Sequence, residues 1–213
     1  GAVREFVQTA EDLGYSHIRI LDHVVGANPE KHPEVPEFYY THESVIREPF
    51  TLMAYIAGFT ENIGLVTGII ILPQRQTILV AKQAAEVDVL SGGRLRLGVG
   101  VGWMEEEFQA MGLDTFKERG AVTDEYLQLY KELWTKENPS FQGKYYQISD
   151  TGFEPKPVQK PHPPIWIGGQ SKPAIRRAAQ IGDCWHPVGA IPAAPLEPEE
   201  LAENLGLLHQ YAE

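Results

Sequence analysis

The feature of this sequence that most restricts its fold is a strand–helix–strand unit spanning residues 63–101. Residues 63–72 are almost continuously apolar, which is typical of a strand buried on both faces of a parallel sheet. Residues 77–90 then have helical apolar spacing, and a second strand pattern follows at 94–101. Between them stand Gly92 and Gly93, which we expect to form the left-handed exit of the helix. The unit predicts a parallel α/β fold.

The same alternation continues on both sides of this unit. Five strands are expected, at residues 17–21, 63–72, 94–101, 165–167 and 184–188. Helices are expected at 2–13, 49–60, 77–90, 118–134, 172–181 and 198–212, with a shorter one near 105–111. An eight-stranded barrel needs three more strands. Either the fold is a smaller open sheet, or the chain is part of a longer barrel, which is the interpretation we favour.

Two segments interrupt the alternation, and we treat both as insertions into a single domain covering residues 1–213. Residues 24–48 show little periodicity, and a loop of this length usually has a binding function or is disordered. Residues 135–162 contain a small hairpin or lone edge strand at 141–148, followed by a proline-rich extended connection.

Charge and composition exclude several classes of partner. The net charge is −11, from 29 acidic and 18 basic residues, and no basic cluster offsets it. Nucleic acid and anionic membranes are therefore not expected partners. The longest apolar run is too short for a membrane span of about 20 residues, and no export signal is recognisable. Cys184 is the single cysteine, which permits no internal disulfide and favours the cytoplasm.

Glycines alternate along the strand at 94–101 and just beyond it. Gly98, Gly100 and Gly102 occupy every second position, which suggests that the strand leaves room for another chain segment or for a ligand. The alternative is that they only permit tight packing of strands. A dinucleotide-binding G-x-G-x-x-G fingerprint does not fit, because Trp103 or Glu105 stands where its last glycine belongs.

A second glycine turn follows the strand at 165–167. Gly168, Gly169 and Gln170 lead into a helix whose expected N-cap is Ser171. A strand, paired glycines and a helix start suit a phosphate, because free N–H groups and the helix dipole point towards it. The alternative is a plain tight turn with an ordinary cap.

Taken together, the chain resembles the bacterial luciferase-like superfamily, and most closely its deazaflavin-dependent oxidoreductases, which use coenzyme F420. The resemblance is carried by residues 10–24 (AEDLGYSHIRILDHV), 163–185 (PPIWIGGQSKPAIRRAAQIGDCW) and 67–108, which include LSGGRLRLGVGVGWMEEEF. It implies a TIM-barrel-like (β/α)8 fold of the bacterial luciferase type, here partial, without its first strand and last two strands. The site is then expected at the C-terminal ends of the strands.

The resemblance also implies which residues hold the cofactor. The ring is expected over the end of the second strand, with a non-proline cis peptide between Gly68 and Ile69. Asp22 would hold the ring's tail or polar edge, and Trp103 would form a wall. The remaining expected contacts are those of the strand ends and the phosphate turn, namely Thr67, Gly100, Val101, Gly102, Gly168, Gly169, Gln170 and Ser171.

His23 is the expected catalytic residue, as a proton donor or acceptor on the substrate side, since imidazole titrates near neutral pH. An ordinary loop histidine is the alternative. Trp103 stands where sugar-phosphate dehydrogenases of this group usually carry a glutamate, which argues against a glucose-6-phosphate-type substrate. Glu106 is expected to supply a carboxylate instead, although acidic residues at a helix start are often simply solvated.

Three functions remain open from the sequence. The leading one is hydride transfer between coenzyme F420 and an unknown organic substrate. The second is an FMN-dependent monooxygenase that receives reduced flavin from a reductase. The third is a non-catalytic binding or assembly subunit. We expect a small-molecule substrate, a flavin or F420 reductase as partner, a homodimer, and no metal.

Overall fold

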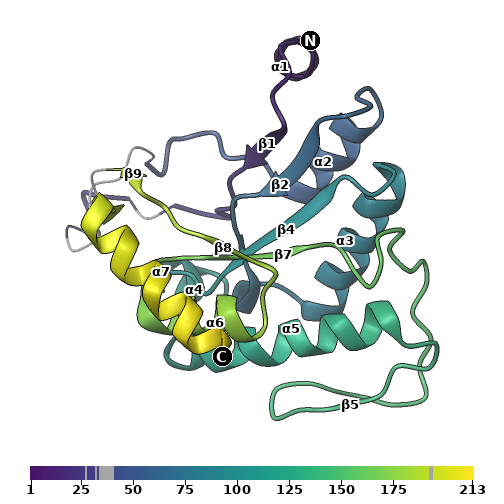
Figure 1. Cartoon of the computed structure of the whole chain (residues 1–213), viewed down its shortest axis with the longest axis vertical. Helices are drawn as coiled ribbons and strands as arrows, with labels where there is room; N and C mark the ends of the chain where they lie inside the picture. The colour runs from purple at the N-terminus through teal and green to yellow at the C-terminus, as the bar shows by residue number, and fades with distance from the viewer. Residues whose placement is uncertain (27, 32, 34–40, 192–193) are drawn as a thin grey trace.

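The structure, a computed structural model, describes residues 1–26, 28–31, 33, 41–191 and 194–213 and is built on a parallel sheet (Figure 1). The sheet has six strands. Five of them lie side by side in chain order, namely β1 (His17–Ile20), β2 (Gly64–Thr67), β4 (Leu95–Gly100), β7 (Ile165–Gly168) and β8 (Cys184–His186). The sixth, β3 (Ile70–Ile71), also pairs with β4. All five expected strands and the parallel α/β fold are confirmed.

Helices alternate with these strands as expected. They are α1 (Ala2–Asp12), α2 (Pro49–Ala57), α3 (Thr77–Leu90), α4 (Glu105–Ala110), α5 (Arg119–Thr135), α6 (Lys172–Gln180) and α7 (Pro198–Ala212). Figure 1 shows the yellow α7 lying along α6. Gly92 and Gly93 have φ angles of 65° and 86°, so the predicted left-handed exit from α3 is confirmed. No helix in the described residues is both long enough and apolar enough to cross a bilayer.

The two faces of the sheet differ in character because side chains alternate along each strand. One face is apolar and packs with α2, α3 and α5 in the core; its side chains are at most 1% exposed and include Leu65, Leu97, Val99, Ile165 and Ile167. The opposite face is polar and aromatic. There the Trp166 ring lies 5.8 Å from that of His17 and 5.5 Å from that of His186.

The expected single strand at residues 63–72 is wrong in detail. The run divides into β2, β3 and a 3-10 helix, η1 (Leu72–Gln74). The division falls at the Gly68–Ile69 bond, which is cis, as the resemblance implied. Beyond β2 the backbone groups find other partners, since Gly68 N donates to Ile20 O and Ile71 N donates to the Asp22 carboxylate.

The two predicted insertions contain little regular structure. In residues 24–48 the described part has no helix or strand, and residues 27, 32 and 34–40 lie outside the described residues. In residues 135–162, β5 (Phe141–Gln142) and β6 (Gln147–Ile148) form the small antiparallel hairpin. A second hairpin, of β9 (Ala190–Ile191) and β10 (Ala194–Pro195), was not predicted. A short 3-10 helix, η2 (Thr115–Glu118), precedes α5.

Candidate functional site

The parallel sheet brings the predicted site residues to one edge. Asp22 and His23 follow β1, Ile69 follows β2, Trp103 follows β4 and Ser171 follows β7. Because these strands run in the same direction, their C-terminal ends share an edge, which is where sites occur in barrels of this type. The expected location of the site is therefore consistent with the observed topology.

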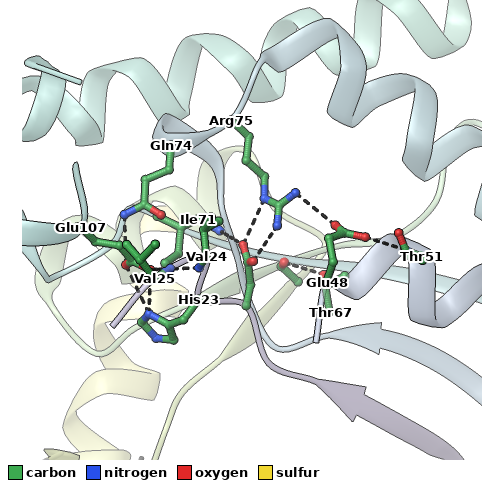
Figure 2. A network of polar contacts seen from close by, with 12 residues as sticks. His23, Val24, Val25, Glu48, Thr51, Thr67, Ile71, Gln74, Arg75 and Glu107 are labelled. Atoms are coloured by element: carbon green, nitrogen blue, oxygen red, sulfur yellow. Dashed lines mark hydrogen bonds and ion pairs between the residues drawn. The ribbon is translucent and has the colours of Figure 1, made fainter. Parts of the chain in front are cut away.

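His23 is paired with a buried carboxylate at this edge (Figure 2). Its Nδ1 lies 3.2 Å from both Oε1 and Oε2 of Glu107. The side chains are 12% and 0% exposed respectively, so the pair is shielded from bulk water. A carboxylate without its proton can only accept, so Nδ1 donates.

The Glu107 carboxylate also accepts from three other groups. Val24 N and Val25 N donate to Oε1 at 3.1 and 3.4 Å, and Gln74 Nε2 donates to Oε2 at 3.1 Å. Glu107 thus joins the segment after β1 to α4 and η1. All four of its partners are donors, which is the arrangement that stabilises a buried carboxylate.

Sequence reasoning missed Glu107 and named its neighbour. Glu105 is exposed and Glu106 is half-buried, whereas Glu107 is 1% exposed. The structure does not bring Glu106 to His23, and a role for it stays a prediction. The missed signal was helical spacing, because Met104 and Phe108 are buried on the same face as Glu107.

Asp22 lies in a second buried network beside the first. Its carboxylate accepts from Ile71 N at 3.0 Å and from Nε and Nη2 of Arg75 at 3.2 and 2.6 Å. Arg75 Nη1 also reaches Glu48 Oε1 at 3.2 Å, and Glu48 Oε2 accepts from Thr51 N at the start of α2. Both oxygens of Asp22 therefore have protein partners, and its predicted contact with a cofactor stays a prediction.

Burial opposes the charged forms of Arg75 and Glu48, but their partners more than compensate. The carboxylates of Asp22 and Glu48 raise the pKa of Arg75 above its ordinary value. The pKa of Glu48 is lowered, since Thr51 N and Arg75 outweigh desolvation. The network therefore favours full charge on both groups at neutral pH.

The glycine alternation on β4 makes room for the chain itself. A Cβ on Gly98 would overlap the carbonyl oxygen of Thr67, and one on Gly100 would overlap the Ile69 side chain. On β7, a Cβ on Gly168 would lie 2.9 Å from Ile69 Cγ2. Of the two alternatives that the sequence left open for Gly98 and Gly100, close approach of another segment is therefore the one observed.

Beyond β4 the chain turns through Gly102, whose φ is +80°. Its carbonyl accepts from Arg119 Nε at 3.0 Å, which ties the turn to α5. Val101 is half-buried, and Trp103 is 37% exposed at the end of this turn. A partly exposed indole here is consistent with the predicted wall, which stays a prediction.

The turn after β7 holds its shape through two side chains. Trp185 Nε1 donates to Gly169 O at 2.8 Å, and Gln170 Nε2 donates to Pro195 O at 3.2 Å. Ser171 is the N-cap of α6, as predicted, but its side chain makes no capping hydrogen bond. The first turn of α6 therefore has no side-chain acceptor from its cap, which leaves it suited to an anion.

In the described residues, no group of three or more His, Cys, Asp or Glu side chains could hold a metal ion. The chemistry available at the edge is therefore that of one imidazole with its carboxylate, an indole, an aliphatic Ile69 side chain and a helix N-terminus.

Comparison with known proteins follows from this geometry. The chain is 35% identical over 147 residues to an FMNH2-dependent dimethylsulfone monooxygenase of Pseudomonas putida, covering 68% of this chain and 39% of that protein. It is 33% identical over 181 residues to the pyrimidine monooxygenase RutA of Allorhizobium ampelinum, covering 83% and 46%. The chain thus spans less than half the length of these two relatives.

Solved structures share the fold. The monooxygenase RslO1 from Streptomyces bottropensis aligns with a TM-score of 0.78 and 25% identity, over 99% of this chain and 58% of that one. The coenzyme F420-dependent tetrahydromethanopterin reductase from Methanopyrus kandleri aligns with a TM-score of 0.77 and 18% identity, over 99% and 57%. The fold is therefore the α/β TIM-barrel type of these proteins, of which this chain covers part.

The family assignment rests on the sequence as a whole. A family model described as luciferase-like monooxygenase matches residues 1–204. This match includes all the strands of the parallel sheet and the whole candidate site. The chain belongs to the luciferase-like monooxygenase family.

Proposed function

We propose that this chain carries the cofactor-binding edge of an oxidoreductase that acts on a small organic substrate with a flavin-type cofactor. The observation that carries the proposal is the buried His23–Glu107 pair, at the C-terminal strand edge of a luciferase-like fold. In this proposal His23 gives a proton to the substrate or takes one from it. The cofactor, either reduced FMN or coenzyme F420, supplies the redox chemistry when bound.

The residues at the edge fit such a group. Ile69 is half-buried above Gly100 and Gly168, which offers an aliphatic surface to one face of a flat ring. Trp103 offers a partly exposed aromatic surface. The start of α6 offers N–H groups to a phosphate, although Pro173 in its first turn removes one donor.

The comparisons bear differently on the two cofactors. The two relatives compared above, at 33% and 35% identity, are named as a pyrimidine monooxygenase and an FMNH2-dependent monooxygenase. The F420-dependent reductase is 18% identical, so its likeness concerns the fold alone. We therefore place FMN first for this chain and F420 second, which reverses the order expected from the sequence.

Parallel titrations test the proposal. The purified chain is titrated separately with reduced FMN under anaerobic conditions and with coenzyme F420, following absorbance and fluorescence. Saturable binding of FMN alone supports the first assignment, and saturable binding of F420 alone supports the second. Saturable binding of neither would overturn the proposal and favour a non-catalytic subunit.

A further inference from the structure

We propose that Glu107 is a positioning residue that fixes His23 in the tautomer with its proton on Nδ1. The proposal rests on the proposed function for its role in turnover, but the tautomer itself is a property of the chain alone. Both Glu107 oxygens lie 3.2 Å from Nδ1, so the ring nitrogen faces the middle of the carboxylate. In the neutral imidazole this arrangement makes Nε2 the acceptor nitrogen.

The carboxylate is itself held in place. Val24 N and Val25 N bind one oxygen, and Gln74 Nε2 binds the other (Figure 2). Gln74 turns its amide nitrogen towards Glu107 although its buried Oε1 then has no hydrogen-bond partner among the described residues. The donors thus come from two segments distant in sequence, and the carboxylate is oriented before any ligand binds.

This orientation gives His23 a defined chemical task. A neutral imidazole with its proton on Nδ1 can take a proton on Nε2, on the opposite side of the ring from Glu107. The resulting imidazolium then lies beside a buried carboxylate, which stabilises its charge. The ring can return that proton from the same atom, so Glu107 never needs to exchange a proton.

A purely structural role for Glu107 makes a different prediction. If it only tied residues 24–25 to α4, the His23 tautomer would not depend on its charge. The Glu107→Gln variant separates the two roles. Its amide oxygen can still accept from Val24 N and Val25 N, and its amide nitrogen then faces His23 Nδ1 as a donor. Nδ1 must become an acceptor, so the proton moves to Nε2.

The tautomer can be measured without cofactor by 15N–1H correlation spectra of the imidazole rings at alkaline pH, where imidazoles are neutral. The His23 signals, among those of the 7 histidines, are identified from their loss in His23→Ala. We expect protonated Nδ1 in the wild type and in Glu107→Asp, and protonated Nε2 in Glu107→Gln. The control Glu105→Gln changes an exposed glutamate of the same helix turn and should leave the spectrum unchanged.

A wild-type ring protonated on Nε2 would overturn the proposal, as would a Glu107→Gln spectrum identical to the wild type. If Glu107→Gln does not fold, the wild-type spectrum still decides. In turnover, Glu107→Gln should lower kcat by about 10- to 100-fold, as do losses of carboxylates that orient metal-bound histidines, with KM little changed. Absence of FMN or F420 binding would remove the proposed function and leave the tautomer result standing.

Discussion

The guanidinium of Arg75 donates two hydrogen bonds to the carboxylate of Asp22, from Nη2 to Oδ1 at 2.6 Å and from Nε to Oδ2 at 3.2 Å. The side chains are 13% and 2% exposed, so this pair is largely removed from water. Asp22 precedes His23, and Arg75 follows η1. The pair therefore fixes the strand end that carries the candidate catalytic histidine.

Replacing Arg75 by methionine should destabilise the protein strongly. The substitution keeps much of the aliphatic stem but leaves the Asp22 carboxylate buried with only Ile71 N as donor. Breaking a buried ion pair in this way costs about 3–5 kcal/mol. Urea denaturation followed by circular dichroism would measure the loss of unfolding free energy.

Lys144→Met is the matched control for that substitution. Lys144 Nζ lies 2.7 Å from Glu118 Oε1, but the two side chains are 67% and 52% exposed. An ion pair in water contributes little. An unchanged denaturation midpoint is expected, and equal effects of the two substitutions would contradict a special role for the Asp22–Arg75 pair.

The alternation of strands and helices was predictable because each element has its own period. Apolar runs bounded by glycine and proline predicted the strands, and 3.6-residue spacing predicted helices such as α3 and α5. The division of residues 63–72 was not predictable from periodicity. It depends on tertiary partners, since the Asp22 carboxylate takes the N–H of Ile71.

Gly98→Ala and Gly100→Ala should differ in how they can be rescued. A methyl on Gly98 would meet the Thr67 carbonyl oxygen, which belongs to the backbone and cannot turn aside. A methyl on Gly100 would meet Cδ1 of Ile69, the end of a flexible side chain. Overpacking of either kind costs about 1–3 kcal/mol or more.

Combining each substitution with Ile69→Val tests the difference. Valine lacks the Cδ1 atom, so it should restore most of the stability lost in Gly100→Ala and none of that lost in Gly98→Ala. Thermal denaturation of the singles and doubles gives the two coupling energies. Equal rescue of both glycine variants would show that the cradle around Ile69 is described incorrectly.

The site was predictable in position more than in partners. His23 stands at a strand end, and the resemblance pointed to it and to the cis bond at Gly68–Ile69. The choice of Glu106 failed to find the partner of His23, because three consecutive glutamates look alike until the helix face is known. The contact between residues 23 and 107 joins segments 84 positions apart, which no local pattern specifies.

Glu11 should make the protein sensitive to acid. Its carboxylate accepts from Glu61 N, Asn62 N and Ile63 N at 3.1, 2.6 and 2.8 Å, which ties α1 to the start of β2. Burial opposes its charge, but these donors and Arg94 lower the pKa of Glu11 below its ordinary value. A lowered pKa stabilises the fold above the unfolded value of about 4.3, and this stability is lost as pH falls through the folded pKa.

The variant Glu11→Gln removes this titration while keeping an acceptor oxygen. Its melting temperature should therefore be lower than that of the wild type at neutral pH, and the difference should shrink below about pH 4. Glu5→Gln, an exposed position in the first turn of the same helix, is the control. A difference between Glu11→Gln and wild type that is constant from neutral pH to pH 3 would contradict the prediction.

His23→Ala should reduce turnover far more than cofactor affinity. If the imidazole moves a proton between the protein and the substrate, its loss should lower kcat by about 10²- to 10⁴-fold. The cofactor dissociation constant should change little, because the predicted ring contacts are Ile69 and Trp103. Steady-state kinetics with the FMN or F420 titration separates the two effects, and His209→Ala, at an exposed position on α7, is the control. Equal losses in kcat and cofactor affinity would instead place His23 in cofactor binding.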